Sequence, residues 1–514
     1  MNGQRKSDRS VVPAAETKPS NKAHAGARAA EMVEGRDLAD GNTRQLNAPR
    51  TQRRPSVPSG LERVREAAKK DRGARFTALL HHVSIDALRS AFEKLNKKAA
   101  SGIDGMTWQQ YEGRLEENLK VLHGKLHRGS YRAKPSRRVH IPKADGRLRP
   151  LGIASLEDKL VQRAVVEVLN AVYEADFLGF SYGFRPKRSQ HDALDALATG
   201  IQRKKVNWVL DADIRGYFDA IDHGWLKKFV EHRIADKRVL RLIQKWLTAG
   251  VMEEGRWTES SEGTPQGATV SPLLANVYLH YVLDLWLQQW RKKRAHGDVI
   301  AVRYADDFIV GFQYQSDAEQ FLEELRKRLR KFSLELHPEK TRLIEFGRYA
   351  AERRRERNAG KPATFNFLGL THICARTKRG EFQLARRTMR ERMRAKLSEV
   401  KAELGLLKHA PIPKQGRYLH AVVTGFFRYH AVPTNMRALK AFRTEVQKLW
   451  LNTLRRRSQK DGATWDHMKA RIKRWVPAAR IQHPWPMERF ERQHQLQEPS
   501  AAIPLARICA GGGP

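Results

Sequence analysis

Cysteine is almost absent from this sequence of 514 residues, which contains only Cys374 and Cys509. Two cysteines cannot build a disulfide framework or a zinc site with four cysteine ligands, and this composition is typical of the reducing cytoplasm. Long apolar runs are also absent, since none approaches the roughly 20 residues that a membrane-spanning helix needs. The first residues lead into no apolar segment of the kind that marks a secretion signal. We therefore expect a cytoplasmic protein without a membrane partner.

Acidic residues are scarce relative to basic ones. The chain carries 97 Lys and Arg against 56 Asp and Glu, which gives a formal net charge of +41. An excess of this size favours a polyanionic partner, and nucleic acid is a better candidate than a membrane surface. The length is sufficient for two or three domains. Composition thus indicates a multidomain protein that binds RNA or DNA.

The most informative acids lie in the segment 300–310. Apolar residues with high strand propensity run up to Tyr304, then come Asp306 and Asp307, and Phe308 resumes the apolar pattern. This pattern predicts a β-hairpin with two carboxylates at its tip. Aspartate pairs occur in ordinary hairpin turns, where they bond only the backbone. Adjacent carboxylates repel each other unless a cation bridges them, so the alternative is a site for a divalent metal ion.

A second acidic segment and a loop bounded by Gly and Pro precede that hairpin. Residues 207–213 predict a strand that ends in acid, with Asp211 and Asp213 on one face. Asp213 is then either a helix cap or a third metal ligand. The loop Pro265-Gln266-Gly267 lies between this strand and the hairpin. Because acids from separate segments can meet on one sheet, we expect a carboxylate cluster.

Strands and helices alternate through the middle of the chain, which predicts an α+β fold. Residues 137–153 predict two strands joined by a turn, with Lys143, Arg147 and Arg149 near it. Such a cluster is either a solvated face or, beside a nucleotide substrate, a clamp for a triphosphate. Ser316 to Glu319 predicts a capping box that opens a helix, and the apolar stripe of that helix should pack on a sheet.

Further short motifs complete an ordered set along the chain. The set comprises Asp213 with Phe218 after it, Pro265-Gln266-Gly267, Tyr304-Ala305-Asp306-Asp307, Lys340-Thr341 and Phe367-Leu368-Gly369. In this order the motifs resemble those of reverse transcriptases, in the variants found in bacterial group II intron-encoded proteins. Residues 101–105 and 425–430 are similar to the same family. The resemblance covers the chain from about residue 61 to the C-terminus.

The resemblance implies an RNA-directed DNA polymerase with a right-hand fold of fingers, palm and thumb. It would extend a DNA primer on an RNA template from dNTPs by in-line phosphoryl transfer. Asp213, Asp306 and Asp307 would bind two Mg²⁺ ions, with Asp211 in reserve, because Mg²⁺ prefers hard oxygen ligands. The resemblance places the nucleotide against Lys143, Arg147, Arg149, Phe218, Gln266 and Lys340, with Phe218 screening the sugar 2′ hydroxyl. It places primer and template near Pro265, Gly267, Phe367, Leu368 and Gly369.

The last third of the chain concentrates basic and aromatic residues. Residues 386–404 predict a basic helix with an apolar stripe, and a single helix of this kind is ordinarily a solvated surface. Repeated basic stretches with tryptophan among them suit structured RNA, through phosphate contact and base stacking. The candidate RNA-binding residues are Arg387, Arg390, Arg394, Arg455 and Arg456, with Trp450, Trp465, Trp475 and Trp485 interspersed. By resemblance this thumb is also a maturase region, which binds the host group II intron RNA, assists splicing and supports mobility at a DNA target.

These observations predict five segments. They are a flexible tail (1–58), a helical extension (59–105), fingers and palm (106–372), a thumb and maturase domain (373–469) and a basic segment that could bind DNA (470–514). The zinc-bearing HNH endonuclease of many family members is not expected, since only Cys509 lies near the end. We expect a bacterial cytoplasmic protein, associated with the nucleoid during mobility. The rival functions are an RNA-binding maturase with an inactive polymerase, and a polymerase of a retron, CRISPR or phage-defence system.

Overall fold

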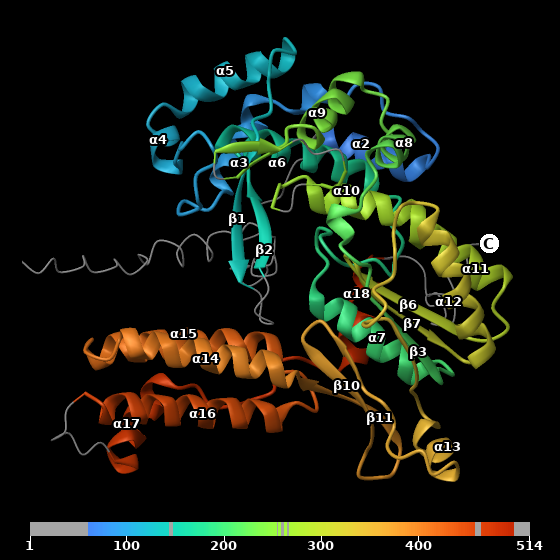
Figure 1. The fold of residues 1–514 in the computed structure, drawn as a ribbon, viewed down its shortest axis with the longest axis vertical. Helices are drawn as coiled ribbons and strands as arrows, with labels where there is room; N and C mark the ends of the chain where they lie inside the picture. The colour runs from blue at the N-terminus through green and yellow to red at the C-terminus, as the bar shows by residue number, and fades with distance from the viewer. Residues whose placement is uncertain are drawn as a thin grey trace, which may run out of the picture.

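The computed structural model describes residues 60–142, 148–253, 255–258, 262–264, 267–457 and 464–497. Within these residues the chain forms helices and three separate β-sheets, so the expected α+β class is confirmed. Figure 1 shows a helix-rich N-terminal region at the top, a layered sheet at the right and a helical bundle at the lower left. The expected tail, 1–58, lies outside the described residues. No helix in the described part of the chain is long and apolar enough to cross a membrane.

The central sheet consists of β6 (Val299–Tyr304), β7 (Asp307–Phe312), β3 (Trp208–Ala212) and β8 (Arg342–Glu345), in this order and with antiparallel neighbours. Helix α7 (Gln190–Arg203) covers one face and α12 (Gln315–Arg330) the other. Successive side chains of a strand point to opposite faces. Val209 accordingly packs in the cluster that contains α7, and Leu210 packs in the cluster that contains α12. Because Asp211 and Asp213 follow Val209 at intervals of two, both acids belong to the α7 face.

Helix α12 confirms the predicted apolar stripe, which is buried against the sheet, but not the predicted capping box. The helix begins at Gln315, before Ser316, and no described side chain caps its first turn. Asp317 is instead buried and accepts hydrogen bonds from the backbone N–H of His296 at 3.0 Å and of Gly297 at 3.1 Å. The loop before β6 therefore recruits this carboxylate, because a buried acceptor must find its donors wherever they are available.

The N-terminal region packs its helices around the long buried helix α6 (Leu156–Tyr173). The predicted pair of strands is confirmed as an antiparallel hairpin of β1 (Ser136–Pro142) and β2 (Leu148–Ile153), which β4 (Val251–Glu253) and β5 (Arg256–Thr258) extend into a sheet of order β2-β1-β4-β5. The turn of this hairpin lies outside the described residues. The other elements before the central hairpin are α2 (Gly60–Lys70), η2 (Leu80–His82), α3 (Ile85–Glu93), α4 (Trp108–Glu112), α5 (Leu115–His127), η3 (Tyr217–Asp219), α8 (His223–Glu231), α9 (Lys237–Leu247), α10 (Ser271–Leu279), the π-helical turn η4 (His280–Asp284) and α11 (Leu285–Lys293).

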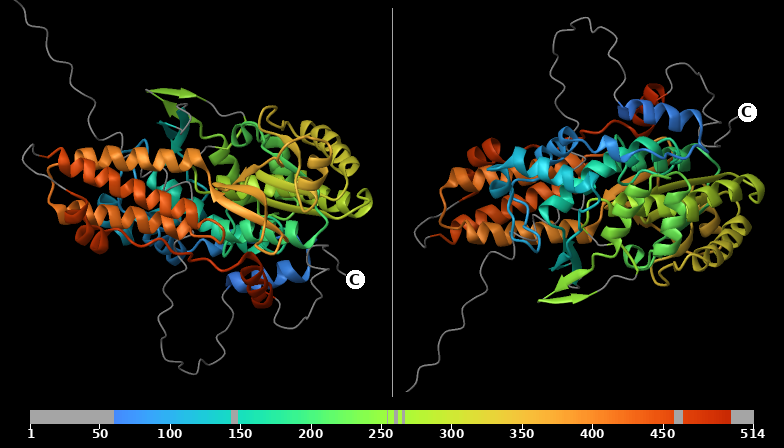
Figure 2. Two further views of the ribbon diagram at one scale, coloured as in Figure 1. Left: turned by 90° about the horizontal axis from the view of Figure 1, so that it is seen from below. Right: turned by 90° about the horizontal axis from the view of Figure 1, so that it is seen from above.

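The C-terminal third forms a small sheet and a bundle that projects to one side of the central sheet (Figures 1 and 2). Its elements are α13 (Ala350–Glu356), β9 (Phe365–Phe367), β10 (Leu370–Arg376), β11 (Phe382–Thr388), α14 (Arg390–Leu406), α15 (Ile412–His430), α16 (Met436–Arg455) and α17 (Trp465–Trp475). The predicted stripe of α14 lies in the apolar core of the bundle. Trp450 is fully buried there and donates its indole N–H to Gln415 at 2.8 Å. The expectation that Trp450 stacks on RNA is therefore wrong, whereas Trp465 and Trp485 are 44% and 47% exposed.

The last described helix, α18 (Pro486–Gln497), returns from the bundle and packs on α7. Asp195 of α7 is buried between two arginines, at 2.6 Å from Arg386 of β11 and 3.2 Å from Arg489 of α18. This charged cluster ties the base of the bundle to the central sheet. Of the expected segment boundaries, that between 469 and 470 falls inside α17 and that between 372 and 373 falls inside β10.

Candidate active site

The paired acids occupy the tight turn between β6 and β7. Tyr304 and Asp307 are the last paired residues of the ladder, so Ala305 and Asp306 form the turn. Ala305 has a φ of 57°, the left-handed conformation that two-residue hairpin turns favour at this position. Asp307 is exposed to solvent and Asp306 is half-buried. The predicted hairpin is confirmed, and its acids lie where a ligand can reach them.

Asp213 follows the end of β3 and lies beside that turn. β3 and β7 pair with Ala212 opposite Phe308, and extension of this register by one residue sets Asp213 against Asp307. The Asp213 carboxylate accepts a hydrogen bond from Lys340 Nζ at 2.7 Å. Asp213, Asp307 and Lys340, which are far apart in the sequence, thus meet at one end of the central sheet.

Asp213 and Asp211, the two candidates for the third metal ligand, differ in their surroundings. Asp213 does not cap a helix, because the next helical turn begins only at Tyr217. Asp211, the reserve ligand, lies opposite Ile309 in the ladder and is held by Arg342 at 3.1 Å. Both acids share a face and each has its own basic partner, but the register sets Asp213 nearer to the tip of the hairpin.

The neighbouring carboxylates at this end of the sheet raise the affinity of Asp307 for a proton. The pKa of Asp307 is raised to about 7, chiefly because the surrounding protein limits the hydration of its carboxylate. The like charges of Asp306, Asp213 and Asp211 raise this pKa further, in that order, and the Lys340 ammonium acts in the opposite direction. A group of acids that resists full ionisation is one that a bound cation would stabilise.

We expect magnesium to stabilise the protein more at about pH 8 than at about pH 6. The folded-state pKa of Asp307 lies above the unfolded value of about 3.9. Its proton therefore stabilises the native state at low pH, and this contribution is lost as the pH rises towards about 7. Because Mg²⁺ competes with that proton, its effect should grow over the same range.

The measurement for this prediction is the melting temperature with and without magnesium chloride at both pH values. The Asp307→Asn side chain cannot titrate, so this variant should lose most of the pH dependence of the magnesium effect on the melting temperature. An equal magnesium effect at both pH values in the wild-type protein would contradict the prediction.

The donors suit Mg²⁺ but are not assembled around an ion. Carboxylate oxygens are the hard ligands that Mg²⁺ prefers. Among the described residues, no three His, Cys, Asp or Glu side chains are grouped closely enough to hold a metal. Asp213 is instead turned to Lys340, whose side chain is 55% exposed. Metal binding would therefore require Asp213 to exchange this ammonium for the ion.

The loop predicted between the acidic strand and the hairpin begins beside Phe218. The Thr264 N–H donates to the backbone C=O of Phe218 at 2.7 Å. Gly267 lies against β2, where a Cβ would come within 2.7 Å of the Gly152 C=O, and its φ is 99°. Both facts require glycine at this position. Outside the described residues lie Pro265, Gln266, Lys143, Arg147 and the side chain of Arg149.

The tripeptide from Phe367 to Gly369 forms the turn between β9 and β10. Phe367 pairs with Leu370, which leaves Leu368 and Gly369 as turn residues with φ values of 46° and 77°. Positive φ at both positions is typical of a type I′ turn. Tyr429 of α15 donates its hydroxyl to the Leu368 C=O at 2.7 Å, which fixes this turn to the bundle.

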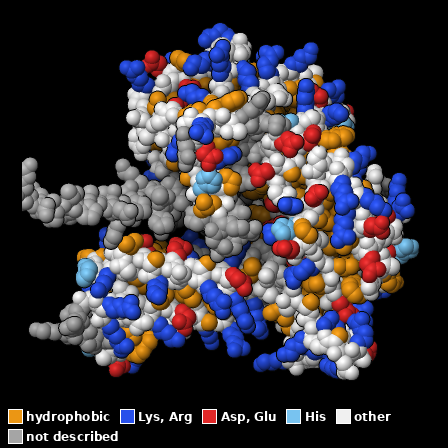
Figure 3. All heavy atoms as spheres, viewed as in Figure 1, with side chains coloured by type: hydrophobic (Ala, Val, Ile, Leu, Met, Phe, Trp, Pro, Cys, Tyr) orange, Lys and Arg blue, Asp and Glu red, His pale blue; other side chains and the backbone are white. Residues whose placement is uncertain are grey.

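The five arginines expected to bind RNA have exposed side chains. Arg387 belongs to β11, Arg390 and Arg394 lie one turn apart on α14, and Arg455 and Arg456 lie at the end of α16. Figure 3 shows Lys and Arg side chains spread over the bundle in this view. All five arginines are thus accessible to a nucleic acid.

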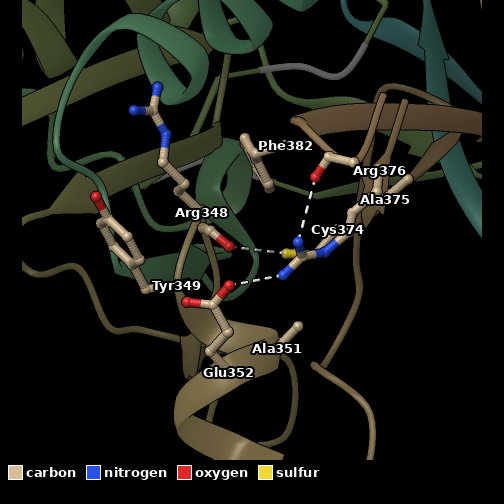
Figure 4. Close-up of a pocket in the computed structure, with 10 residues that line it drawn as sticks. Arg348, Tyr349, Ala351, Glu352, Cys374, Ala375, Arg376 and Phe382 are labelled. Atoms are coloured by element: carbon tan, nitrogen blue, oxygen red, sulfur yellow. Dashed lines mark hydrogen bonds and ion pairs between the residues drawn. The ribbon is translucent and has the colours of Figure 1, made fainter. Parts of the chain in front are cut away.

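A pocket of about 300 Å³ lies away from these acids, between α13 and the β10–β11 hairpin (Figure 4). On its wall Glu352 and Arg376 form an ion pair of 2.7 Å. Burial raises the pKa of the Cys374 thiol to about 11, so this thiol is a poor nucleophile. None of the described site residues lines the pocket, which is therefore not the candidate active site.

Sequence reasoning missed the buried polar groups beneath the hairpin. Arg303 of β6 is 1% exposed and bonds both carboxylate oxygens of Asp284. The available signal was an arginine within an otherwise apolar strand, because an unpaired buried charge costs several kcal/mol. Such a residue must have a partner, although the sequence does not say which.

Comparison with known proteins identifies the class. Residues 141–372, which include the three acids, match the reverse transcriptase (RNA-dependent DNA polymerase) family. The chain is 33% identical to protein YkfC of Escherichia coli over 57% of this chain and 81% of YkfC. It is 32% identical to the group II intron-encoded protein LtrA of Lactococcus lactis over 56% of this chain and 50% of LtrA. It is also 37% identical to a 91 kDa protein in the cob intron of Schizosaccharomyces pombe, over 42% of this chain.

Fold, acids and matches together define an enzyme that polymerises nucleotides on a nucleic-acid template. More particularly, the chain belongs to the reverse transcriptase family, is an RNA-directed DNA polymerase and is related to a group II intron-encoded protein. The resemblance seen in the sequence motifs is thereby confirmed. The matched region spans only half the length of LtrA, so the further activities of such a protein are matters of proposal.

Proposed function

We propose that Asp213, Asp306 and Asp307 bind two Mg²⁺ ions and that this site extends a DNA primer on an RNA template. The observation that carries the proposal is the register that sets Asp213 against Asp307 at the tip of an exposed hairpin. These carboxylates would hold the ions, which would supply activation of the primer 3′ oxygen and charge stabilisation of the leaving pyrophosphate during in-line phosphoryl transfer. The experiment that tests the site is RNA-templated primer extension by wild-type protein and by Asp306→Ala.

Lys340 supplies a positive charge that can move between the acids and the nucleotide. It pairs with Asp213 at 2.7 Å, and its 55% exposed side chain is free to reorient towards a triphosphate. With the Asp213 carboxylate bound to an ion, the Lys340 ammonium would be available to neutralise charge on the phosphates. Phe218 screens the sugar 2′ hydroxyl of the same nucleotide. The remaining nucleotide contacts in this proposal are Gln266, Lys143, Arg147 and Arg149.

The regions of the fold correspond, in this proposal, to the parts of a right hand. Residues 106–372 form fingers and palm, with the central sheet as the palm, and residues 373–469 form the thumb. The turn from Phe367 to Gly369 meets the primer end, supported by its hydroxyl contact with Tyr429 of the bundle. In this proposal Pro265 and Gly267 contact the template.

The second part of the proposal concerns RNA. The bundle binds group II intron RNA and assists its splicing as a maturase, and the polymerase then copies the intron at a DNA target. Support comes from the net charge of +41, the exposed arginines and the relation to an intron-encoded protein. Residues 470–514 add a basic segment for DNA. RNA that co-purifies with the protein should be enriched in intron sequence, and recovery of bulk RNA without enrichment would contradict the maturase role.

Replacing Arg390 and Arg394 with glutamine should weaken RNA binding. If each arginine contacts one phosphate, the dependence of log Kd on log salt concentration becomes shallower by about one to two units. The matched control is the double glutamine variant of Arg326 and Arg330, which are also exposed and four residues apart, but lie on α12. Equal effects of the two double variants would indicate general charge attraction and contradict a dedicated RNA-binding bundle.

A further inference from the structure

We propose that Arg303 is a positioning residue for polymerisation, because its buried hydrogen-bond network fixes the turn that carries Asp306 and Asp307. The inference rests on the proposed function of these two acids as metal ligands. Arg303 itself is buried and acts through the backbone of the turn, so it is not a catalytic residue.

The network starts from a fully buried ion pair. The Arg303 side chain donates from Nε to Asp284 Oδ1 at 2.7 Å and from Nη2 to Asp284 Oδ2 at 2.6 Å. Arg303 is 1% exposed and Asp284 is 0% exposed. Asp284 ends the π-helical turn η4, and such turns occur frequently at functional sites. Because apolar side chains usually stabilise a core at least as well as a buried ion pair, stability does not by itself account for this pair.

The same guanidinium reaches the catalytic turn. Arg303 Nη1 donates to the C=O of Ala305 at 2.9 Å. This carbonyl belongs to the peptide bond that joins Ala305 to Asp306, so the contact fixes the orientation of the backbone from which the Asp306 side chain departs. Arg303 Nη2 also donates to the Ser181 hydroxyl at 2.7 Å. The guanidinium therefore fixes the backbone of the turn, while Asp284 and Ser181 fix the guanidinium.

Asn276 links the Arg303 side chain to Gly183, which packs against the backbone of the turn. Arg303 Nη1 donates to Asn276 Oδ1 at 2.9 Å, and Asn276 Nδ2 donates to the Gly183 C=O at 2.6 Å. Gly183 lies directly on the turn, since a Cβ there would be 2.2 Å from the backbone nitrogen of Ala305. Ala305 is thus confined on its nitrogen side by Gly183 and on its carbonyl side by Arg303.

This confinement explains the unusual backbone of Ala305. A residue other than glycine at a φ of 57° is strained and persists only where its surroundings hold it. If the network loosens, the turn can relax and the two carboxylates move together. Outer-shell contacts that orient metal ligands typically contribute about 10- to 100-fold to activity or metal affinity.

The test is Arg303→Lys, which retains the charge but loses the planar fork. We expect kcat for RNA-templated primer extension to fall by about 10- to 100-fold. The half-saturating Mg²⁺ concentration should rise by about 3- to 10-fold, because the metal ligands are less well oriented. KM for dNTP should change by less than about threefold. This split distinguishes displaced metal ligands from a damaged nucleotide site.

The matched control is Arg233→Lys in the N-terminal region. Arg233 is also 1% exposed and pairs with the buried Asp176 at 2.9 Å, but its other bonds go to the backbone of residues 68–74. Both variants should lower the melting temperature. The Arg233 variant should leave kcat and the Mg²⁺ dependence unchanged.

The inference is overturned if Arg303→Lys loses stability like the control but keeps its kcat and its Mg²⁺ dependence. If Arg303→Lys does not fold, Asn276→Ala takes its place, because it removes the contacts to Arg303 and Gly183 and leaves the ion pair intact. An unchanged kcat and Mg²⁺ dependence in that variant would also overturn the inference. An inactive wild-type protein would contradict the proposed function itself. If the wild-type protein is active and Asp306→Ala is inactive, the proposed function holds, and the Arg303 and Asn276 variants then test the positioning role alone.

Discussion

Asp307→Asn should abolish primer extension and at the same time make the metal-free protein more stable. Extension should fall by at least about 10³-fold, since a metal ligand contributes several kcal/mol of transition-state stabilisation and each 1.36 kcal/mol is a factor of ten. The melting temperature without magnesium should rise, because an amide removes the repulsion that helps to raise the pKa of Asp307 to about 7. Opposite changes in activity and stability are expected where like charges are held together for function.

Single-turnover extension and thermal denaturation without magnesium measure the two effects. The control is Asp298→Asn, at the other end of β6, where the carboxylate pairs with Lys204 at 3.2 Å. It should leave extension unchanged and should not raise the melting temperature. If Asp307→Asn retained extension, Asp307 would not belong to the polymerase site. If its melting temperature did not rise, repulsion between the carboxylates would not destabilise the metal-free protein.

Asp213→Asn should reduce extension by at least about 10²-fold, whereas Asp211→Asn should change it by less than about threefold. Only Asp213 is set against Asp307 by the register of β3 and β7. Asp211 forms an ion pair with the 48% exposed Arg342, and pairs of this kind contribute little. The two variants change the same charge on the same face of the sheet, two residues apart, so the difference between their activities reports the effect of position.

Extension time courses over a range of magnesium concentrations compare these two variants. The Asp213 variant should require more magnesium, while the Asp211 variant follows the wild-type curve. The reverse order of effects would make Asp211 the third ligand and would show that the register argument fails at the end of the strand.

Local patterns in the sequence were sufficient for several elements. The hairpin of β6 and β7 follows from apolar residues on both sides of two adjacent acids, and its register needs only the short turn at Ala305 and Asp306. The stripe of α12 follows from helical periodicity. The meeting of Asp213 with this hairpin was expected from motif order and resemblance, and the structure gives it a physical basis in the pairing of β3 with β7.

Features that depend on distant partners could not be predicted in the same way. Asp317 caps a loop rather than its own helix because His296 and Gly297 offer their N–H groups. Trp450 stands among basic residues in the sequence but faces the core of the bundle. The apolar residues around Arg303 in the sequence indicate a buried charge. Its partner Asp284 and its contact with the turn are visible only in the structure.

The most direct measurement is extension of a DNA primer on an RNA template, with dNTPs and Mg²⁺, by wild-type protein and by Asp306→Ala in parallel. We expect the wild-type protein to extend the primer and the variant to lose at least about 10³-fold of this activity while it remains folded. Absence of extension by the folded wild-type protein, or equal extension by both proteins, would contradict the assignment of the active site.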